Sequence, residues 1–337
     1  MNNFKNFFIK NNHLRIFNIS AHQLRGKNFF DSIFKYREKI FFLQKKRIKK
    51  LNQYQCSLCS HSYGRIFLRW KKIYILIQCN NCRAVSPNIN HINEDEFINS
   101  VYNNEIYTNK AFEAIYKNYQ YREKTFGLER YNYTIKRLKL KSNCKVLDLG
   151  CGFGYYLKFL KKKNIQCKGL EPATNISNFC KKNLKLNVVS SPLYLEKNNE
   201  YDLITLFDVI EHLKNPLEYF RIINAKMKKN GFCVIYTPNI HSLGYALMGS
   251  EQNTLLPFEH LCFFNKQSFS YLAKSSGFSI HTIENYGFDI MDYLMLKEYK
   301  DKINYTEKLK EMTTIVQAII DQKQLSNHFR VTLKKIK

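Results

Sequence analysis

The sequence predicts an α/β protein whose larger part is a doubly wound, mostly parallel sheet, preceded by a small cysteine-bearing module. Three observations predict this fold. A strand, a glycine-rich turn and a helix follow one another at residues 145–160, further apolar strands alternate with helical patterns after them, and two Cys-x-x-Cys pairs stand upstream. A chain of 337 residues with 45% hydrophobic content can bury a core of about two domains, which excludes the intrinsically disordered class.

The amino-terminal 53 residues are strongly basic. They hold 13 Lys and Arg residues and only two acids, Asp31 and Glu38, in a chain whose formal net charge is +27. Between Phe30 and Leu51 apolar residues recur at helical spacing, which predicts an amphipathic helix with a basic end. This helix would either dock on an anionic surface or partner, or pack on its own protein. The charge has a second explanation, because an AT-rich coding sequence also produces a chain rich in Lys, Asn, Ile, Phe and Tyr.

Two Cys-x-x-Cys pairs, Cys56 with Cys59 and Cys79 with Cys82, are separated by nineteen residues. The apolar segments 66–68 and 73–77 between them predict strands, so the pairs fall at turns that can converge on one tetrahedral ion. This spacing predicts a zinc ribbon with a closed, structural Zn²⁺ site. A redox role or chance spacing is the alternative. The other six cysteines lie among apolar residues and are expected to be reduced and buried.

Four regions are predicted along the chain. They are a basic amphipathic extension at 1–53, the zinc ribbon at 54–92, a helical, aromatic linker or cap at 93–124, and the α/β domain at 125–337. The first residues lack the long apolar core and cleavage site of a secretory signal, and no apolar run is long enough for a membrane span. A cytoplasmic protein is therefore expected.

The turn at residues 148–154 has the sequence Asp-Leu-Gly-Cys-Gly-Phe-Gly and joins the predicted strand 145–149 to a helix that begins at Tyr155. Its glycines let the backbone approach a ligand, and the helix start offers unpaired N–H groups. A dinucleotide fingerprint would need a glycine at Tyr155 and a P-loop would need a lysine, so both are disfavoured. A second strand, 167–170, ends at Glu171, whose carboxylate can accept hydrogen bonds from both hydroxyls of a ribose.

These residues resemble the class I S-adenosylmethionine-dependent methyltransferases, whose first strand carries an acidic-x-Gly-x-Gly-x-Gly loop and whose second strand ends in an acid. The resemblance covers about residues 125–337 and implies a Rossmann-like sheet of seven strands. It also implies S-adenosylmethionine as the cofactor, with the methionine portion held by the loop and the ribose by Glu171. The residues that it places at the cofactor are Asp148, Gly150, Cys151, Gly152, Gly154, Glu171, Pro172 and Asp208.

The downstream segments resemble the same family. Residues 201–207 look like its fourth strand, and 232–236, 279–283 and 328–333 look like its fifth, its sixth and its antiparallel seventh. Asn215 and Pro216 form a helix start after the fourth strand. One departure concerns the adenine. Many relatives place an acidic or amide side chain there after the third strand, whereas this chain has Ser190 and Ser191, so a backbone or hydroxyl contact is expected.

The catalytic candidates follow the fourth and fifth strands. The segment 208–213 resembles that of small-molecule O-methyltransferases of the ubiquinone type; if Asp208 begins a helical turn, Asp208 and His212 share a face and Glu211 lies beside them. The group would be a general base or, since some related enzymes use a Glu-His pair in this way, part of a divalent-metal site that acidifies a hydroxyl. The alternative is that Asp208 caps the helix and His212 only packs. His260, within the aromatic segment 257–264, is the second candidate base.

The predicted function is methyl transfer from S-adenosylmethionine to a small-molecule or glycan acceptor. A sugar or nucleotide-linked sugar is favoured, because a zinc ribbon followed by a methyltransferase resembles proteins of bacterial surface-polysaccharide pathways. RNA- or DNA-directed methylation, with the ribbon and basic arm as docking surface, is one alternative. The chain lacks an Asn/Asp-Pro-Pro-aromatic motif and a Pro-Cys dipeptide, so a nucleic acid is not the expected partner. A second alternative is a non-catalytic binding protein on the same fold. Docking of residues 1–53 on a membrane or a partner also stays open.

Overall fold

The computed structural model describes the chain except for residues 1–19, 27, 94–95, 97–98, 100–117 and 337. The first part of the predicted basic extension and most of the predicted helical linker therefore lie outside the described residues. Among the described helices, none has the length and apolar content needed to span a membrane.

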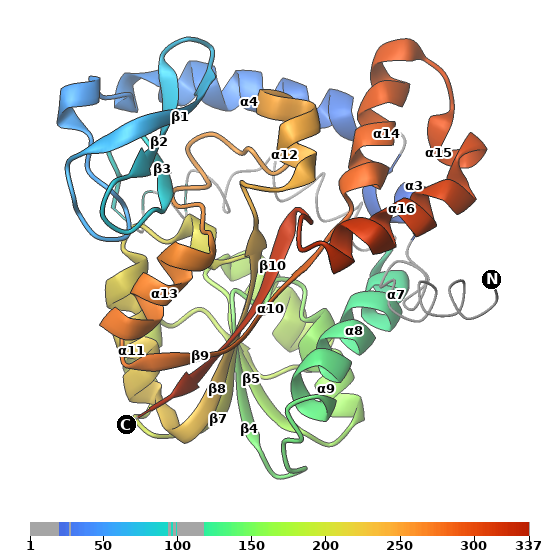
Figure 1. The fold of residues 1–337 in the computed structure, drawn as a ribbon. Helices are drawn as coiled ribbons and strands as arrows, with labels where there is room; N and C mark the ends of the chain where they lie inside the picture. Colours follow the sequence, from blue (N-terminus) through green and yellow to red (C-terminus); the bar gives the residue numbers. More distant parts are fainter. Residues whose placement is uncertain (1–19, 27, 94–95, 97–98, 100–117, 337) are drawn as a thin grey trace.

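A seven-stranded sheet forms the centre of the α/β part of the molecule (Figure 1). Its strand order is β6-β5-β4-β7-β8-β10-β9. The neighbours from β6 to β8 pair in parallel, whereas β10 runs antiparallel to both β8 and β9. The predicted sheet, with an antiparallel last strand in the chain, is confirmed. The strands are β4 (Lys145–Leu149), β5 (Gln166–Leu170), β6 (Val188–Val189), β7 (Tyr201–Phe207), β8 (Met227–Pro238), β9 (Phe278–Tyr286) and β10 (His328–Lys335).

Helices cover both faces of this sheet because successive strand residues point to opposite sides. Val146 of β4 belongs to an apolar cluster with Leu160 of α9, whereas the next residue, Leu147, belongs to one with Phe220 of α11. Figure 1 shows α11 and α13 on one face, and α8 and α9 on the other. The helices that follow the glycine turn are α9 (Tyr155–Lys162), α10 (Thr174–Lys182), α11 (Pro216–Lys226), α12 (Leu243–Met248), α13 (Lys266–Ser275), α14 (Asp289–Asp301), α15 (Tyr305–Lys308) and α16 (Lys310–Gln322).

A helical segment at 119–136 precedes the sheet. It consists of α7 (Tyr119–Arg122) and α8 (Leu128–Tyr131), each followed by a wider π-helical turn. An ion pair anchors the segment to the sheet, because Arg330 Nη2 of β10 lies 2.8 Å from Glu129 Oε1 and both side chains are largely buried. The segment continues across the predicted boundary at residues 124 and 125, and the division into four domains stays a prediction.

The cysteine-bearing module is a three-stranded antiparallel sheet of β1 (Gly64–Trp70), β2 (Tyr74–Cys79) and β3 (Val85–Pro87). Both strands predicted between the cysteine pairs are present. The module packs directly on the α/β part, since Val85 and Phe263 exchange two backbone hydrogen bonds and Ser57 Oγ donates to the carbonyl of Leu261 at 2.9 Å.

The predicted basic helix is α4 (Phe29–Gln44), preceded by the short α3 (Ala21–Arg25), and it is shorter than predicted. The helical pattern to Leu51 is wrong beyond Gln44 because Ile48 leaves the helix to pair with Ile89 beside the ribbon. Lys45–Arg47 form a 3₁₀ turn, and a second such turn spans Leu51–Gln53. Phe30 and Ile40 are buried, so one face of α4 packs on its own protein.

Candidate functional site

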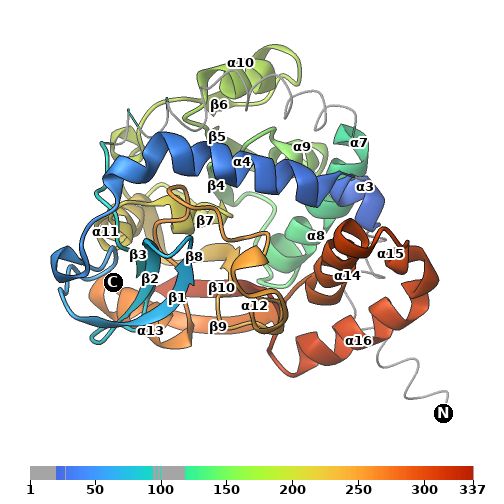
Figure 2. The same cartoon turned by 90° about the horizontal axis from the view of Figure 1, so that it is seen from above.

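A cavity of about 1450 Å³ lies where the parallel strands end. Residues that follow β4, β5 and β7 line it, among them Gly152, Glu171 and Asp208, together with Leu24 and Phe29 of the amino-terminal arm. Figure 2 shows α4 crossing the molecule over this end of the sheet. The carboxyl ends of parallel strands are the usual ligand-binding edge of an open α/β sheet, and this volume is large enough for two small molecules side by side.

The three loop glycines have positive φ angles of +62°, +51° and +69° at Gly150, Gly152 and Gly154, which other residues adopt only with strain. A Cβ atom on Gly150 would meet Val209 Cγ2 at 2.6 Å, and one on Gly154 would meet Leu186 Cδ1 at 2.6 Å. A Cβ on Gly152 would meet no described atom within 4 Å. Gly150 and Gly154 are therefore needed for packing, whereas Gly152 borders open space in the cavity.

The carboxylate of Glu171 is tied to this loop. Its Oε2 accepts a hydrogen bond from the backbone N–H of Gly152 at 2.8 Å, and its Oε1 accepts one from that of Ala173 at 2.9 Å. Burial raises the pKa of this carboxyl, while the two N–H donors act in the opposite direction. Each carboxylate oxygen keeps a further lone pair, so Glu171 can still accept from two hydroxyls in the cavity. Cys151, Pro172, Ser190 and Ser191 also line the cavity.

Asp148 and Gly154 differ from the other predicted cofactor residues because they do not line the cavity. The Asp148 carboxyl is buried within the sheet. It is 1% exposed, and Thr205 Oγ1 donates to its Oδ1 at 2.7 Å. Burial raises the pKa of Asp148 to about 7. The carboxyl thus cross-links β4 to β7 below the loop.

Asp208 does not begin a helical turn, so the predicted shared face with His212 is wrong. Its φ is +59°, a left-handed conformation, and a 3₁₀ turn starts only at Ile210. The reason is the sharp turn that the chain makes on leaving β7, where the Asp208 N–H still bonds to the carbonyl of Tyr236. The carboxylate of Asp208 points instead towards β10, with Oδ1 3.6 Å from His328 Nε2.

Glu211, His212 and His260, three of the predicted catalytic residues, do come together. One ligand atom from each lies within 4.8 Å of the other two. The imidazole rings of His212 and His260 meet edge to face with centroids 4.7 Å apart. The segment that carries His260 is fixed there because the N–H groups of Leu261 and Cys262 both donate to the backbone carbonyl of Glu211, at 2.7 and 3.1 Å.

The polar atoms of this cluster are incompletely paired. Thr237 Oγ1 donates to Glu211 Oε2 at 2.9 Å, but Glu211 Oε1 and His260 Nδ1 are buried with no hydrogen-bond partner among the described residues. His212 Nδ1 lies 3.1 Å from the carbonyl of Glu259, so Nδ1 carries the proton and Nε2 the lone pair. Burial lowers the pKa of His212 to about 4, lowers that of His260 well below its usual value, and raises the pKa of Glu211. Both histidines are therefore neutral near pH 7.

Two further cavity residues were missed by the sequence reasoning. His328 is the first residue of β10. Because β10 runs antiparallel, this residue lies at the edge where the parallel strands end. The predicted antiparallel direction of the last strand could therefore have indicated that His328 lies at the cavity. His328 Nδ1 lies 3.0 Å from Asn327 Oδ1, which also accepts from the N–H of Phe288. Arg130 lies over the ring of Phe207 at 4.2 Å, and nothing in its helical sequence context pointed to the cavity.

The four predicted zinc ligands also converge. Cys56 and Cys82 Sγ atoms are 3.5 Å apart, as are those of Cys59 and Cys79, and all four lie within 4.8 Å of one another. His61 is not part of this cluster.

The seven-stranded sheet and this loop resemble those of class I, S-adenosylmethionine-dependent methyltransferases, and residues 121–283 match the model of a family described as a methyltransferase domain. Curated relatives are similar over part of their length. The chain is 26% identical over 166 residues to the ubiquinone biosynthesis O-methyltransferase of Rickettsia bellii, covering 44% of this chain and 68% of that protein. It is 34% identical over 134 residues to the enzyme of the same name from Aliivibrio fischeri, covering 36% and 57%.

Solved structures of methyltransferases are also similar to this chain. A putative sarcosine dimethylglycine methyltransferase from Galdieria sulphuraria is 16% identical with a TM-score of 0.46, over 64% of this chain and 88% of that one. An S-adenosylmethionine-dependent methyltransferase from Archaeoglobus fulgidus is 22% identical with a TM-score of 0.44, over 61% and 94%.

Asp148→Asn tests the burial of the Asp148 carboxyl. The asparagine keeps an acceptor for Thr205 and resembles the protonated acid. The folded-state pKa of about 7 lies above the unfolded value near 4, so the native carboxyl contributes less stability as pH rises between about 4 and 7. Urea unfolding without cofactor should show the variant gaining stability over the native chain, on the order of a few kcal/mol, only across this window. A difference that is the same at pH 4 and pH 8 would contradict the assignment.

Proposed function

We propose that this methyltransferase transfers the methyl group to a hydroxyl of a small acceptor that carries neighbouring hydroxyls. The observation that carries the proposal is the convergence of Glu211, His212 and His260 in the cavity that the glycine loop opens into. A hydroxyl must lose its proton to become a nucleophile, whereas the sulfonium needs only alignment. The relatives named O-methyltransferases support oxygen as the acceptor atom.

For the acceptor we propose a sugar or nucleotide-linked sugar. This class rests on the order of ribbon and methyltransferase along the chain, and a dihydroxylated aromatic ring offers the same pair of neighbouring hydroxyls. The two acceptor classes share the chemistry proposed here and are separated by experiment.

S-adenosylmethionine would supply the electrophilic methyl group, and the residues present fit it. Gly152 leaves open space for its methionine portion, and Glu171 would accept from the ribose hydroxyls. Arg130, a cation in the cavity lining near the loop, would pair with the methionine carboxylate. Asp148 would act through the loop rather than by direct contact, since its carboxyl does not line the cavity.

A divalent cation fits the histidine and glutamate cluster. Two neutral imidazoles and a carboxylate form a donor set suited to such ions, and Glu211 Oε1 and His260 Nδ1 are buried without another partner among the described residues. The ion would lower the pKa of a bound hydroxyl. Asp208, which the sequence also placed in this group, lies beside His328 instead and is not part of the proposed donor set.

His328 is then the proposed proton acceptor. Its Nδ1–H donates to Asn327, which leaves Nε2 facing Asp208 and the cavity, and the carboxylate of Asp208 would stabilise the imidazolium once formed. His260 as the base stays the prediction from the sequence, but its burial favours a ligand over a base. For the cysteine cluster we propose structural Zn²⁺, because four thiols and no open position suit a closed tetrahedral site.

Gly152→Ala tests the cofactor site, with Gly249→Ala as its matched control. Both glycines have a positive φ, +51° and +54°, and at neither would a Cβ meet a described atom within 4 Å, but only Gly152 lines the cavity. Both variants should lose stability, on the order of 1–3 kcal/mol, because alanine is strained at a positive φ. Calorimetric titration with S-adenosylhomocysteine should show at least about tenfold weaker binding for Gly152→Ala alone. Equal binding by both variants would rule out this loop as the cofactor site.

Glu211→Gln tests the cation site. Calorimetric titration with Mn²⁺ should show binding by the native chain and none by the variant, because the amide removes the only charge in the donor set. Binding of S-adenosylhomocysteine should not change, and zinc content should also stay, since the cysteine cluster is separate. Glu251→Gln, which removes a surface carboxylate paired with Lys300, should bind Mn²⁺ as the native chain does. Unchanged Mn²⁺ binding by Glu211→Gln would refute the site.

The acceptor is tested with a methyl-labelled donor and separate fractions of nucleotide sugars, glycans, dihydroxylated aromatic acids and RNA. The proposal expects alkali-stable label on oxygen in one of the two sugar fractions. Label in the aromatic acids would keep the hydroxyl chemistry and replace the acceptor class. Label in RNA, or on nitrogen or carbon, would overturn the proposal.

A further inference from the structure

The segment from Lys39 to Asn93 contains eleven Lys and Arg residues and no Asp or Glu. It covers the end of α4, the two 3₁₀ turns and the whole three-stranded module. A surface with one sign of charge over this length attracts anionic partners and repels cationic ones.

Large apolar side chains are exposed on the same segment. Phe42 is 71% exposed, Leu43 57%, Ile73 50% and Leu51 44%. Exposed lysines stand beside them in the chain. We define the docking patch as these four apolar residues with Lys45, Lys46, Lys50 and Lys72.

Contacts between α4, the β1–β2 turn and the chain before Leu51 place the parts of the docking patch next to one another. The β1–β2 turn lies against α4, where Lys71 Nζ is 2.6 Å from Glu38 Oε2, so the carboxylate of Glu38 is already paired. Lys45 Nζ lies 5.1 Å from the ring centroid of Phe42. The Asn88 side chain donates to the carbonyls of both Lys49 and Ile73, which brings the chain before Leu51 next to the same turn. Figure 1 shows α4 and the β1–β2 hairpin together at the top of the molecule.

We propose that the docking patch binds the surface of a bilayer that contains anionic phospholipids. Its lysines would pair with the headgroup phosphates, and its Phe, Leu and Ile side chains would be buried at the boundary between the headgroups and the acyl chains. A nucleic acid would use the lysines but gain nothing from exposed Leu43, Leu51 and Ile73, because it binds through phosphates and base stacking. This docking is independent of the proposed acceptor chemistry.

Vesicle flotation of the full chain tests the proposal. The native chain should float with vesicles of phosphatidylcholine and phosphatidylglycerol and should not float with pure phosphatidylcholine. Replacing Lys45, Lys46 and Lys50 by Gln should weaken partition on the order of 100-fold, since each lysine contributes about fivefold. Phe42→Ser with Leu43→Ser should weaken it at least about tenfold at the same net charge.

Two control variants carry the same kinds and numbers of substitutions at exposed positions outside the docking patch. Gln at Lys181, Lys182 and Lys185 removes three lysines from the region of α10, and Met312→Ser with Ile315→Ser removes two exposed apolar side chains from α16. Both should float as the native chain does, and all variants should keep its circular dichroism and thermal midpoint. Equal loss in patch and control variants, full flotation of the Phe42 and Leu43 variant, or tighter binding to RNA than to the vesicles would each overturn the proposal.

Discussion

The two hydrogen bonds from Leu261 and Cys262 to the carbonyl of Glu211 are the interaction on which the rest of the site depends. They fix a loop that follows β8 in the chain against the turn that follows β7. Together with the contact between His212 Nδ1 and the Glu259 carbonyl, they hold His260 beside His212 and Glu211. The same loop is also the attachment point of the cysteine-bearing module, through Phe263 and Val85. One segment therefore sets both the geometry of the cluster and the placement of the module.

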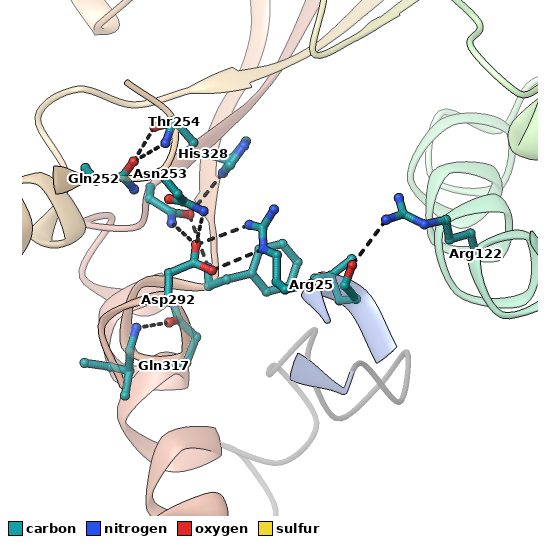
Figure 3. Close-up of polar contacts among 12 residues, drawn as sticks. Arg25, Arg122, Gln252, Asn253, Thr254, Asp292, Gln317 and His328 are labelled. Carbon is teal, nitrogen blue, oxygen red and sulfur yellow. Dashed lines mark hydrogen bonds and ion pairs between the residues drawn. The ribbon is translucent and has the colours of Figure 1, made fainter. Parts of the chain in front are cut away.

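The amino-terminal helices α3 and α4 also contribute to the site, because residues from both segments line the cavity or contact its lining. Arg25 of α3 pairs with the buried Asp292 of α14, which also accepts from Asn253 (Figure 3). Tyr36 of α4 donates to Glu259, the neighbour of His260. Leu24 and Phe29 complete the lining above the sheet. Because these residues of the amino-terminal arm contact the cavity or its neighbours, a displacement of α4 would change the shape of the cavity.

The sequence was most informative where a pattern reflects backbone physics. The glycine loop, the strand ends and the paired cysteines have fixed local geometry, so the sheet, the place of the loop after β4 and the convergence of the four cysteines could be predicted. The end of α4 could not, because pairing of Ile48 with Ile89 is a tertiary contact that overrides helical spacing. The left-handed Asp208 and the cavity position of His328 could not either, since both depend on how β7 leaves the sheet and on β10 running antiparallel.

The most direct test of the central claim is an anomalous diffraction map of the chain crystallised with Mn²⁺ and S-adenosylhomocysteine. We expect one manganese peak among the side chains of Glu211, His212 and His260, with the sulfur of the cofactor product in the same cavity and its ribose at Glu171. A manganese peak elsewhere, or a cofactor sulfur outside the cavity that these residues line, would contradict it.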